Sequence, residues 1–361
     1  MQKIQKQRQY FLDNIKFFLA IIVIFDHSFD YFKNVFPSYH QVFNAICGFN
    51  QSYFMDLFFF ISAYFIIPSY LNKEEKYFIK DKVRRLGGAV IITLFIIDPI
   101  TDVIKFFGKT TILQSYTGYL TANDRWNTIV SLQWGSLLGV TWFCWALLVF
   151  TIIWCLFLDK SNLIHIKKKP FPSFIKIILF CLMMVPINSF AIMLNNHLGN
   201  SFLGFRLIKY FPTYVAAFYF GLQAHKHDWI KQITFKHAIY GLIMFSLVFW
   251  GIFFHQFGYK RIDDPYAIFR TFMAFGMIIF ILYIFKNLFN YSNRFIKELT
   301  RSSFPAYVVQ SIFLCFLFQW VAPKLTYNPW AITIIIGTIS TIFSFILGIV
   351  LVRTPYFNRI F

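Results

Sequence analysis

Long apolar stretches recur along the whole chain, and no other feature of the sequence limits its possible folds as strongly. Ten of them are long enough to cross a hydrocarbon core of roughly 30 Å as an α-helix. They lie at residues 11–32, 49–71, 86–107, 134–158, 173–194, 206–224, 237–257, 267–285, 302–322 and 329–352. The sequence therefore predicts an all-α, polytopic transmembrane helix bundle with about ten spans.

The composition excludes a water-soluble fold. The chain is 58% hydrophobic and only 14% charged, whereas a typical soluble domain is about 25% charged. Phenylalanine alone accounts for 51 of the 361 residues, which is more apolar surface than a soluble fold of this length can bury. Membrane lipids are therefore expected partners of this chain.

The distribution of Lys and Arg predicts the orientation in the membrane. Alternate connections carry 22 of these residues, while the connections between them carry 6. The positive-inside rule assigns the basic set to the cytoplasm, which places both termini there and predicts a multi-pass protein of the cell inner membrane. The net charge of +19 is thus a topology signal and does not indicate a nucleic-acid partner. The basic connections are 1–10, 72–85, 159–170, 225–236, 286–301 and 353–361.

The sequence predicts one integral-membrane domain over residues 1–361. The apolar first span, preceded by basic residues and followed by no small-residue cleavage site, is expected to stay uncleaved. The longest outer connection, 108–133, is expected to form a short lid or a re-entrant turn. The five cysteines show no CxxC or CxxH spacing, and His225 and His227 have no nearby Cys or Glu, so no disulfide framework and no metal site is expected.

Charged and titratable residues within a span are costly and mark candidate functional sites. The first span holds the densest such cluster, formed by Asp13, Lys16, Asp26, His27 and Asp30. Lys16 and His27 are eleven positions apart, so on a helix they point about 20° apart and lie roughly 16 Å from each other. His27 is suited to general-base chemistry, with Asp26 or Asp30 to orient it. The alternative is that His27 is merely solvated in the outer headgroup region.

Polar residues in and after the second span form a second candidate site. Ser62 and Tyr64 lie in mid-span, and Arg84 and Arg85 belong to the most basic loop. Ser62 alternatively serves helix packing as a small residue, and the arginines alternatively anchor the helix end. A basic cluster at the mouth of a bundle is also what a phosphate-bearing donor requires.

Three further residues have both a structural and a functional interpretation. Trp142 begins the fourth span, where an interfacial aromatic belt is the usual explanation and substrate stacking is the other. Arg206 and Arg270 open the sixth and eighth spans from the outer side. Each is expected to extend its side chain to the membrane surface, or to hydrogen-bond sugar hydroxyls in an outer cleft.

Several motifs together resemble those of acyltransferase family 3, and the resemblance covers essentially the whole chain. The segment Arg8-Gln-Tyr-Phe-Leu-Asp13-Asn-Ile-Lys16, followed by His27-Ser28, is similar to the opening helix of this family, in which a basic residue, usually Arg, precedes the catalytic histidine by eleven positions. Phe58-Phe-Phe-Ile-Ser62-Ala-Tyr64-Phe resembles the stretch Phe-Ile-Ser-Gly-Tyr/Phe, with Ala in place of Gly. The segment 78–86 resembles the basic loop of the family.

Weaker matches follow later in the chain. Thr141-Trp142-Phe resembles Leu-Trp-Phe, and Tyr219-Phe-Gly221-Leu-Gln-Ala-His225 resembles Phe-Phe-Leu-Gly-Leu-Leu-Ala. The stretch 301–310 resembles Ser-Tyr-Ala-Val-Tyr-Leu-Ile-His, with Gln310 where many members have histidine. A glutamine cannot act as a base, so Gln310 can only hydrogen-bond substrate.

The resemblance implies a membrane O-acyltransferase, the class that includes lipopolysaccharide O-acetyltransferases and the succinyltransferase of periplasmic glucans. An acetyl or succinyl group would pass from a cytoplasmic acyl-CoA, a co-substrate rather than a tightly bound cofactor, to a hydroxyl of an envelope glycan. The implied catalytic residues are His27, Lys16 and Asp26. The expected substrate-binding residues are Asp13, Ser62, Tyr64, Arg84, Arg85, Trp142, Arg270 and Gln310.

Two alternatives without acyl transfer remain open from the sequence. A transporter could export a glycan through the same polar pore, although the inverted repeats and broken spans of transporters are not evident. A proton-linked carrier would use Asp26 and His27 as a relay.

Overall fold

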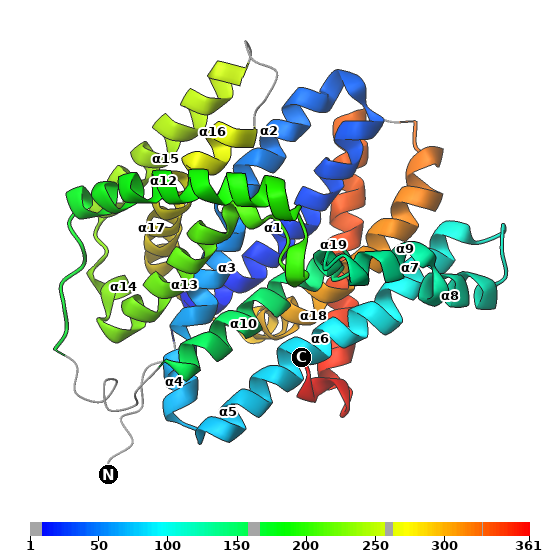
Figure 1. Ribbon diagram of the computed structural model, residues 1–361, viewed down its shortest axis with the longest axis horizontal. Coiled ribbons are helices and arrows are strands. Elements are labelled where there is room, and N and C mark those ends of the chain that lie inside the picture. The colour runs from blue at the N-terminus through cyan, green and yellow to red at the C-terminus, as the bar shows by residue number, and fades with distance from the viewer. Residues whose placement is uncertain (1–8, 158–166, 257–262, 327) are drawn as a thin grey trace.

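The computed structural model describes residues 9–157, 167–256, 263–326 and 328–361. Within these ranges the chain is a bundle of helices, with a single isolated β-bridge between Phe107 and Thr110 (Figure 1). The predicted all-α polytopic fold is therefore confirmed. Eight helical segments in the described ranges are long and apolar enough to cross a membrane: Pro37–Leu71, Glu75–Phe106, Gly139–Leu156, Phe174–Leu198, Phe235–Phe254, Arg270–Leu288, Arg294–Lys324 and Pro329–Arg353.

Two further helices coincide with the other predicted spans. Helix α1, Tyr10–Val35, has 26 residues and includes the charged cluster of the first span. Helix α13, Phe211–Lys226, has 16 residues and is apolar over most of its length. The count of ten spans and the cytoplasmic position of both termini stay predictions.

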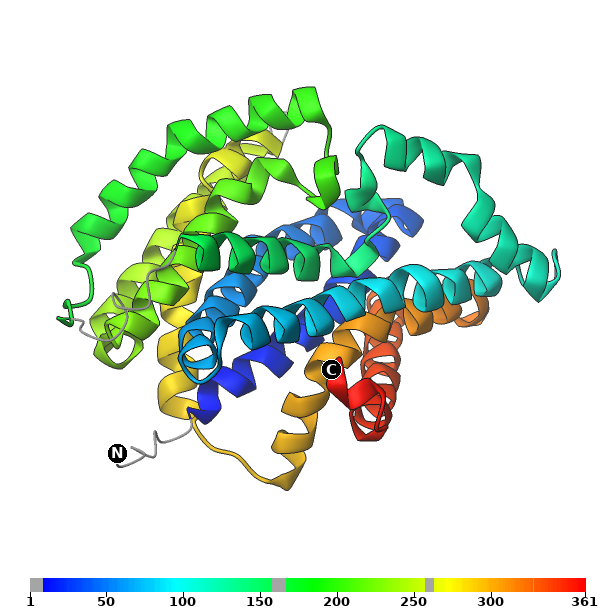
Figure 2. The ribbon, with the colours of Figure 1, turned by 60° about the horizontal axis from the view of Figure 1, so that its bottom comes forward.

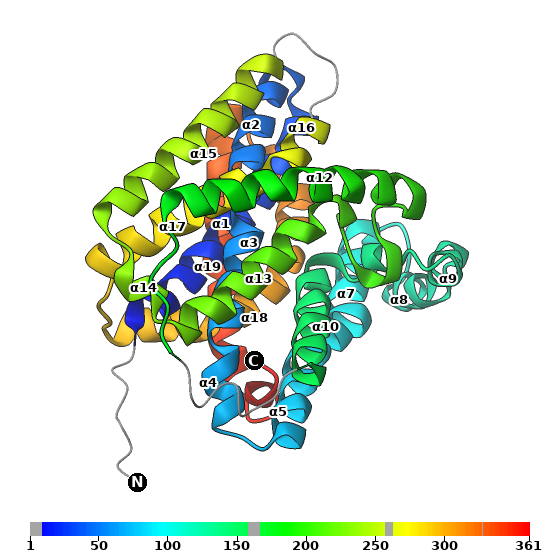
Figure 3. The same ribbon diagram turned by 60° about the vertical axis from the view of Figure 1, so that its left-hand side comes forward.

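The remaining helices range from long ones such as α12 and α19 to single-turn pieces such as α14, and α8 and α9 lie at the edge of the bundle (Figures 1 and 3). Two of the long segments contain π-helical turns, which add one residue to a helical turn. In Glu75–Phe106 these turns are Val83–Gly87 and Thr93–Ile97, and in Arg294–Lys324 the turn is Leu317–Val321. The other helices are α2 (His40–Gln51), α3 (Phe54–Tyr64), α4 (Ile66–Leu71), α5 (Glu75–Lys82), α6 (Gly88–Ile92), α7 (Asp98–Phe106), α8 (Ile112–Thr121), α9 (Asn123–Val130), α10 (Trp142–Leu156), α12 (Phe174–Leu198), α14 (Trp229–Gln232), α15 (Phe235–Gln256), α16 (Asp263–Ile268), α17 (Arg270–Leu288), α18 (Arg294–Phe316) and α19 (Pro329–Arg353).

Glycines allow neighbouring helices to approach closely. Helix α13 crosses α3 where Gly221 faces the carbonyl oxygen of Phe60, and a Cβ atom at this position would collide with that oxygen. Helix α15 crosses α17 at Gly241, where an added Cβ would lie 2.7 Å from the carbonyl oxygen of Gly276. Small residues at such crossings are typical of helix packing in membranes, where lipid tails compete with apolar side chains.

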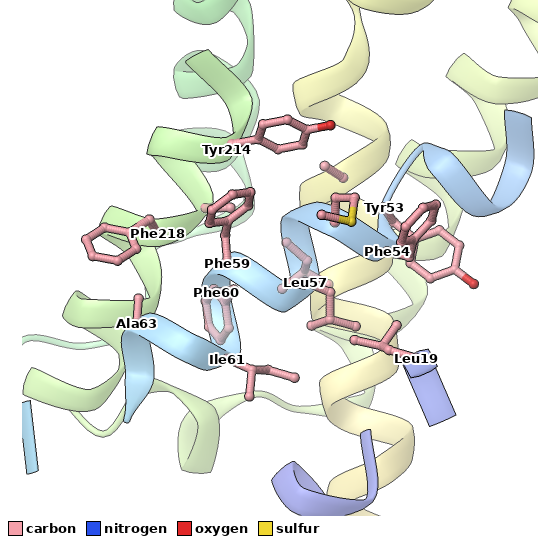
Figure 4. Packing of buried hydrophobic residues seen from close by; sticks show 14 of the residues in the cluster. Leu19, Tyr53, Phe54, Leu57, Phe59, Phe60, Ile61, Ala63, Tyr214 and Phe218 are labelled. Atoms are coloured by element: carbon pink, nitrogen blue, oxygen red, sulfur yellow. The ribbon is translucent and has the colours of Figure 1, made fainter. Parts of the chain in front are cut away.

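Helix α3 lies at the centre of the bundle, between α1, α13 and α17 (Figure 4). Its aromatic side chains pack against those of neighbouring helices. The ring of Phe59 lies 5.1 Å from the ring of Tyr214 on α13 and 4.7 Å from that of Phe143 on α10. Polar residues carried by α3 and its neighbours are therefore held in a rigid, tightly packed setting.

The connection 108–133 contains two short helices, α8 and α9, which extend from the end of α7 (Figure 2). A capping box between Thr111 and Gln114 begins α8. The hydroxyl of Tyr119 donates to the Asp98 carboxylate over 3.2 Å, and the guanidinium of Arg125 lies 3.0 Å from the centre of the Tyr119 ring. These contacts fasten the connection to α7.

Candidate active site

A cavity of about 250 Å³ brings together side chains from helices that are distant in the sequence. Three of its lining residues are basic, namely Lys16, Lys82 and Arg85. Four others supply hydroxyl groups, and apolar side chains complete the wall. We call this space the basic cavity. The hydroxyl residues are Ser62, Thr151, Ser303 and Tyr307, and the apolar ones are Phe58, Ile61, Phe65, Ile66, Leu86, Phe143, Leu147 and Phe304.

Lys16 enters the basic cavity from α1. Its ammonium lies 3.4 Å from the Asp13 carboxylate, one helical turn earlier, and 3.9 Å from the centre of the Phe65 ring. The ion pair and the cation–π contact hold the ammonium in place while a third of the side chain stays exposed. Asp13 thus acts on the cavity through Lys16.

The basic loop contributes Lys82 and Arg85, while Arg84 points elsewhere. The Arg84 guanidinium forms an exposed 2.8 Å ion pair with Asp81, but Arg85 lines the cavity and donates to the carbonyl oxygen of Phe361 over 3.1 Å. The sequence predicted both Arg84 and Arg85 as binding residues, and it did not single out Lys82. The signal was available, because residues three apart on a helix share a face, as Lys82 and Arg85 do.

His27 lies farther along α1, on the side of Lys16. The structure confirms that α1 is unbroken from Tyr10 to Val35, so the predicted alignment of Lys16 with His27 holds. The imidazole is half-buried, and Asp30 follows three positions later on the same side of α1. His27 therefore lies on the side of α1 that also carries Lys16 into the basic cavity.

The loop that carries Arg206 has an unusual backbone. Leu203 and Leu207 both have positive φ angles, of 52° and 62°, which are uncommon for residues with a branched side chain. The indole of Trp145 donates to the carbonyl oxygen of Leu203 over 3.1 Å and fixes this conformation. The exposed Arg206 side chain is thus carried on a constrained loop, a feature that is associated with functional sites.

Asp26 forms its hydrogen bonds with α2. The carboxylate accepts from the side-chain amides of Asn50, over 3.3 Å, and of Gln51, over 3.1 Å. Only 2% of Asp26 is exposed. The structure therefore places Asp26 between α1 and α2, and its role in catalysis stays a prediction.

Three other predicted residues occupy different surroundings. Ser62 lines the basic cavity. Tyr64 is buried, and its hydroxyl donates to the Gln9 side chain over 3.0 Å. Trp142 is buried beside Tyr214, with ring centres 5.8 Å apart, so it belongs to the aromatic core and the interpretation as an interfacial belt is wrong.

Arg270 does not extend to the membrane surface, and that expectation is wrong. Only 1% of the side chain is exposed, and its guanidinium forms a 2.8 Å ion pair with the fully buried Asp56. The same nitrogen donates to the carbonyl oxygen of Gln51 over 2.6 Å. Burial of the carboxylate beside the guanidinium explains the inward position, because each charge requires a partner away from water. A direct contact of Arg270 with substrate stays a prediction.

Gln310 lies three residues after Tyr307 on α18 and is fully buried. Its amide nitrogen donates to the backbone carbonyl oxygen of Tyr307 over 2.9 Å, whereas the side-chain oxygen has no partner within the described residues. The hydroxyl of Tyr307 donates to the carbonyl oxygen of Val140. These bonds fix Tyr307 at the wall of the basic cavity.

In the described part of the chain, no group of three or more His, Cys, Asp or Glu side chains is placed to hold a metal ion. His225 packs its ring against Tyr64, and the Nδ1 atom of His227 accepts from the backbone of Lys169 over 3.2 Å. Desolvation lowers the pKa of His227, and the neighbouring Lys226 and Lys169 add to this effect.

The helices and the cavity define a multi-pass membrane protein with an internal basic site. The chain matches the family model of acyltransferase family 3, described as an acyltransferase domain, over residues 9–349. It belongs to this family, and it is a membrane acyltransferase that transfers groups other than amino-acyl groups. No curated protein and no solved structure matches the chain.

Proposed function

We propose that this protein is an O-acyltransferase of the inner membrane that moves an acetyl or succinyl group from a cytoplasmic acyl-CoA to a hydroxyl of an envelope glycan. The observation that carries the proposal is the basic cavity, which gathers Lys16, Lys82 and Arg85 from separate parts of the chain. Anionic phosphates are the natural ligands of such a cluster. The acyl-CoA is a co-substrate that leaves as CoA.

The size and lining of the basic cavity suggest how the donor enters. A volume of about 250 Å³ is small even for a drug-sized ligand, so the nucleotide end of an acyl-CoA stays at the mouth beside the cations. The thioester end then extends inward along the apolar wall formed by Phe58, Phe143 and Leu147. This orientation brings the reactive carbonyl toward Tyr307 and the outer half of α1.

His27 supplies the chemistry in this proposal. A ring nitrogen accepts the proton of the acceptor hydroxyl, and the oxygen attacks the thioester carbonyl carbon. When the tetrahedral intermediate collapses, the carbon–sulfur bond breaks and the thiolate takes the proton from His27. The products are an ester on the glycan and free CoA. In this proposal the exposed Arg206, carried on the constrained loop, stabilises the negative oxygen of the intermediate.

The other predicted residues support this arrangement. Asp13 holds Lys16, and Ser62 offers a hydroxyl to the donor within the basic cavity. Gln310 fixes the backbone of Tyr307. Tyr64, Trp142 and Asp26 act through packing and hydrogen bonds to other protein groups.

The substitution His27→Ala tests the proposal. We expect loss of ester from the envelope polysaccharide, measured by proton NMR, with the protein still present in the membrane at the normal level. The control is His197→Ala, because His197 is an exposed histidine at the end of α12 and no role is assigned to it. Full ester content in the His27→Ala strain would refute the role of His27. Unchanged ester content with and without the gene, together with altered glycan export, would support the transporter instead.

A further inference from the structure

A second cavity, of about 300 Å³, lies at the opposite end of α1 from the basic cavity. Asp30 and Lys33 line it from α1, and they lie about 21–26 Å along the helix axis from Lys16. Helices α2, α15 and α16 provide most of the remaining wall. We call this space the outer cavity, because the charge distribution of the chain predicts that this end of α1 faces away from the cytoplasm.

One wall of the outer cavity carries side-chain amides. Gln41, Asn44 and Gln51 of α2 all line it. The side-chain oxygen of Asn44 accepts from Lys33, and the side-chain nitrogen of Gln51 donates to Asp26. Within the described residues, the other amide atom of each side chain, the nitrogen of Asn44 and the oxygen of Gln51, has no hydrogen-bond partner. The wall therefore offers one donor and one acceptor with unused hydrogen-bonding capacity.

The facing wall is aromatic. Tyr210, Tyr266, Phe249 and Phe253 line the outer cavity on this side. The rings of Tyr210 and Tyr266 lie 5.9 Å apart, and the hydroxyl of Tyr266 donates to the carbonyl oxygen of Gly48 over 2.8 Å. Both tyrosines are buried and held by these contacts. The aromatic wall is therefore a fixed surface and not a set of mobile side chains.

Arg270 supports the same wall from behind. Its guanidinium lies 4.3 Å from the centre of the Tyr210 ring and 5.8 Å from that of Tyr266. Because Asp56 anchors the guanidinium, the buried ion pair determines where the two rings stand. Arg270 is thus a positioning residue for the outer cavity.

The charged groups of the outer cavity compensate each other. The ammonium of Lys33 and the carboxylate of Asp30 form an ion pair of 2.6 Å. Within the described lining, no other Asp, Glu, Lys or Arg side chain is present. A ligand with a net charge would therefore gain little electrostatic attraction in this cavity. A neutral polar ligand does not depend on such attraction.

We propose that the outer cavity binds a neutral sugar ring of the acceptor glycan. A pyranose presents an apolar C–H face, which matches the aromatic wall, and a rim of hydroxyls, which match the free amide groups. Asp30 belongs to this lining and lies three residues after His27 on the same side of α1, so a sugar in the cavity lies near the proposed base. The inference rests on the proposed function and adds to it the location and the neutral character of the acceptor.

Saturation-transfer difference NMR on the full chain tests this inference. The protein is purified in lauryldimethylamine oxide, because detergents with sugar headgroups would occupy the site. The probes are methyl β-glucoside, methyl α-rhamnoside and N,N′-diacetylchitobiose as neutral sugars, and methyl β-glucuronide as the acidic counterpart. We expect the wild type to bind at least one neutral probe and to bind the glucuronide more weakly.

Variants locate the binding. Asn44→Ala is expected to weaken binding of the neutral probe about 3- to 10-fold, which is the usual effect of one neutral hydrogen bond. Gln41→Ala removes a second amide of the lining and is expected to leave folding intact, because Gln41 is exposed. The matched control is Asn127→Ala, an exposed asparagine of α9 outside the cavity, which should bind as the wild type does. Asp30→Asn leaves Lys33 unpaired and should shift the preference toward the glucuronide.

The results separate this inference from the proposed function. His27→Ala should bind the neutral probe normally and yet form no ester. Sugar binding that depends on Asn44, without ester formation by the wild type, would refute the proposed function and leave the outer cavity as a sugar site. Equal binding by wild type, Asn44→Ala and Gln41→Ala, a preference of the wild type for the glucuronide, or no binding of any neutral probe would overturn the inference.

Discussion

The ion pair between Asp56 and Arg270 provides a quantitative test of the fold. Its carboxylate is 0% exposed and its guanidinium 1% exposed, at a distance of 2.8 Å. The substitution Asp56→Asn keeps the size of the side chain but removes the negative charge. The guanidinium then keeps only neutral partners, the carbonyl oxygen of Gln51 and the hydroxyl of Tyr214.

The expected cost follows from this burial. Removal of one partner of a buried ion pair destabilises a protein by about 3–5 kcal/mol, because the remaining charge stays buried without compensation. For a chain of 361 residues the loss corresponds to a fall in apparent Tm of roughly 4–7 °C. The double substitution Asp56→Leu with Arg270→Met removes both charges, and it should be more stable than Asp56→Asn.

The assay measures thermal unfolding of the detergent-purified protein. Samples are heated to a series of temperatures, and size-exclusion chromatography gives the fraction that remains folded in each. The matched control is Asp102→Asn, which breaks an ion pair of 3.2 Å with Lys105, a side chain that is 54% exposed. An exposed pair contributes about 0–1 kcal/mol, so this Tm should hardly change. Similar Tm values for Asp56→Asn and Asp102→Asn, or a double variant less stable than Asp56→Asn, would contradict the reasoning.

Two further predictions concern the basic cavity and the helix crossings. Arg85→Gln should raise the KM for acyl-CoA about 10-fold or more, because a charge-assisted contact is lost. The KM of Arg84→Gln should stay within about twofold of the wild-type value, because Arg84 points to Asp81. Equal effects of the two substitutions on KM in steady-state kinetics would show that the cavity does not hold the donor. Gly221→Val should abolish the monodisperse folded protein in size-exclusion chromatography, because its Cβ would collide with the Phe60 carbonyl, whereas Gly251→Val, with no atom within 4 Å of the added Cβ, should elute normally. A normal profile for Gly221→Val would mean that α3 and α13 do not cross here.

Much of the candidate site could be predicted from local sequence. The eleven-residue spacing of Lys16 and His27 fixes their alignment on any unbroken helix, and α1 is unbroken. The basic character of the connection 72–85 could also be seen in the sequence. Local sequence predicted both Arg84 and Arg85 and could not separate them, because the difference depends on how the turn Val83–Gly87 is oriented toward the cavity.

The position of Arg270 shows the limit of this approach. In the sequence it stands at the outer end of a span, where an arginine usually extends to the membrane surface. Its partner Asp56 is 214 positions away, and no local pattern links the two. The long-range packing of α3 against α17 therefore decided the outcome.

The sequence by itself determined that the chain is a polytopic helix bundle, because apolar stretches of this length satisfy their backbone hydrogen bonds in lipid only as helices. It also determined which residues share a face within one helix. The tertiary structure alone decided which faces meet. It joined α1 to the basic loop in one cavity and set amides of α2 opposite the aromatic rings of α15 and α16 in another. Contacts between helices depend on shape and on small residues at the crossings, and these are distributed over the whole chain.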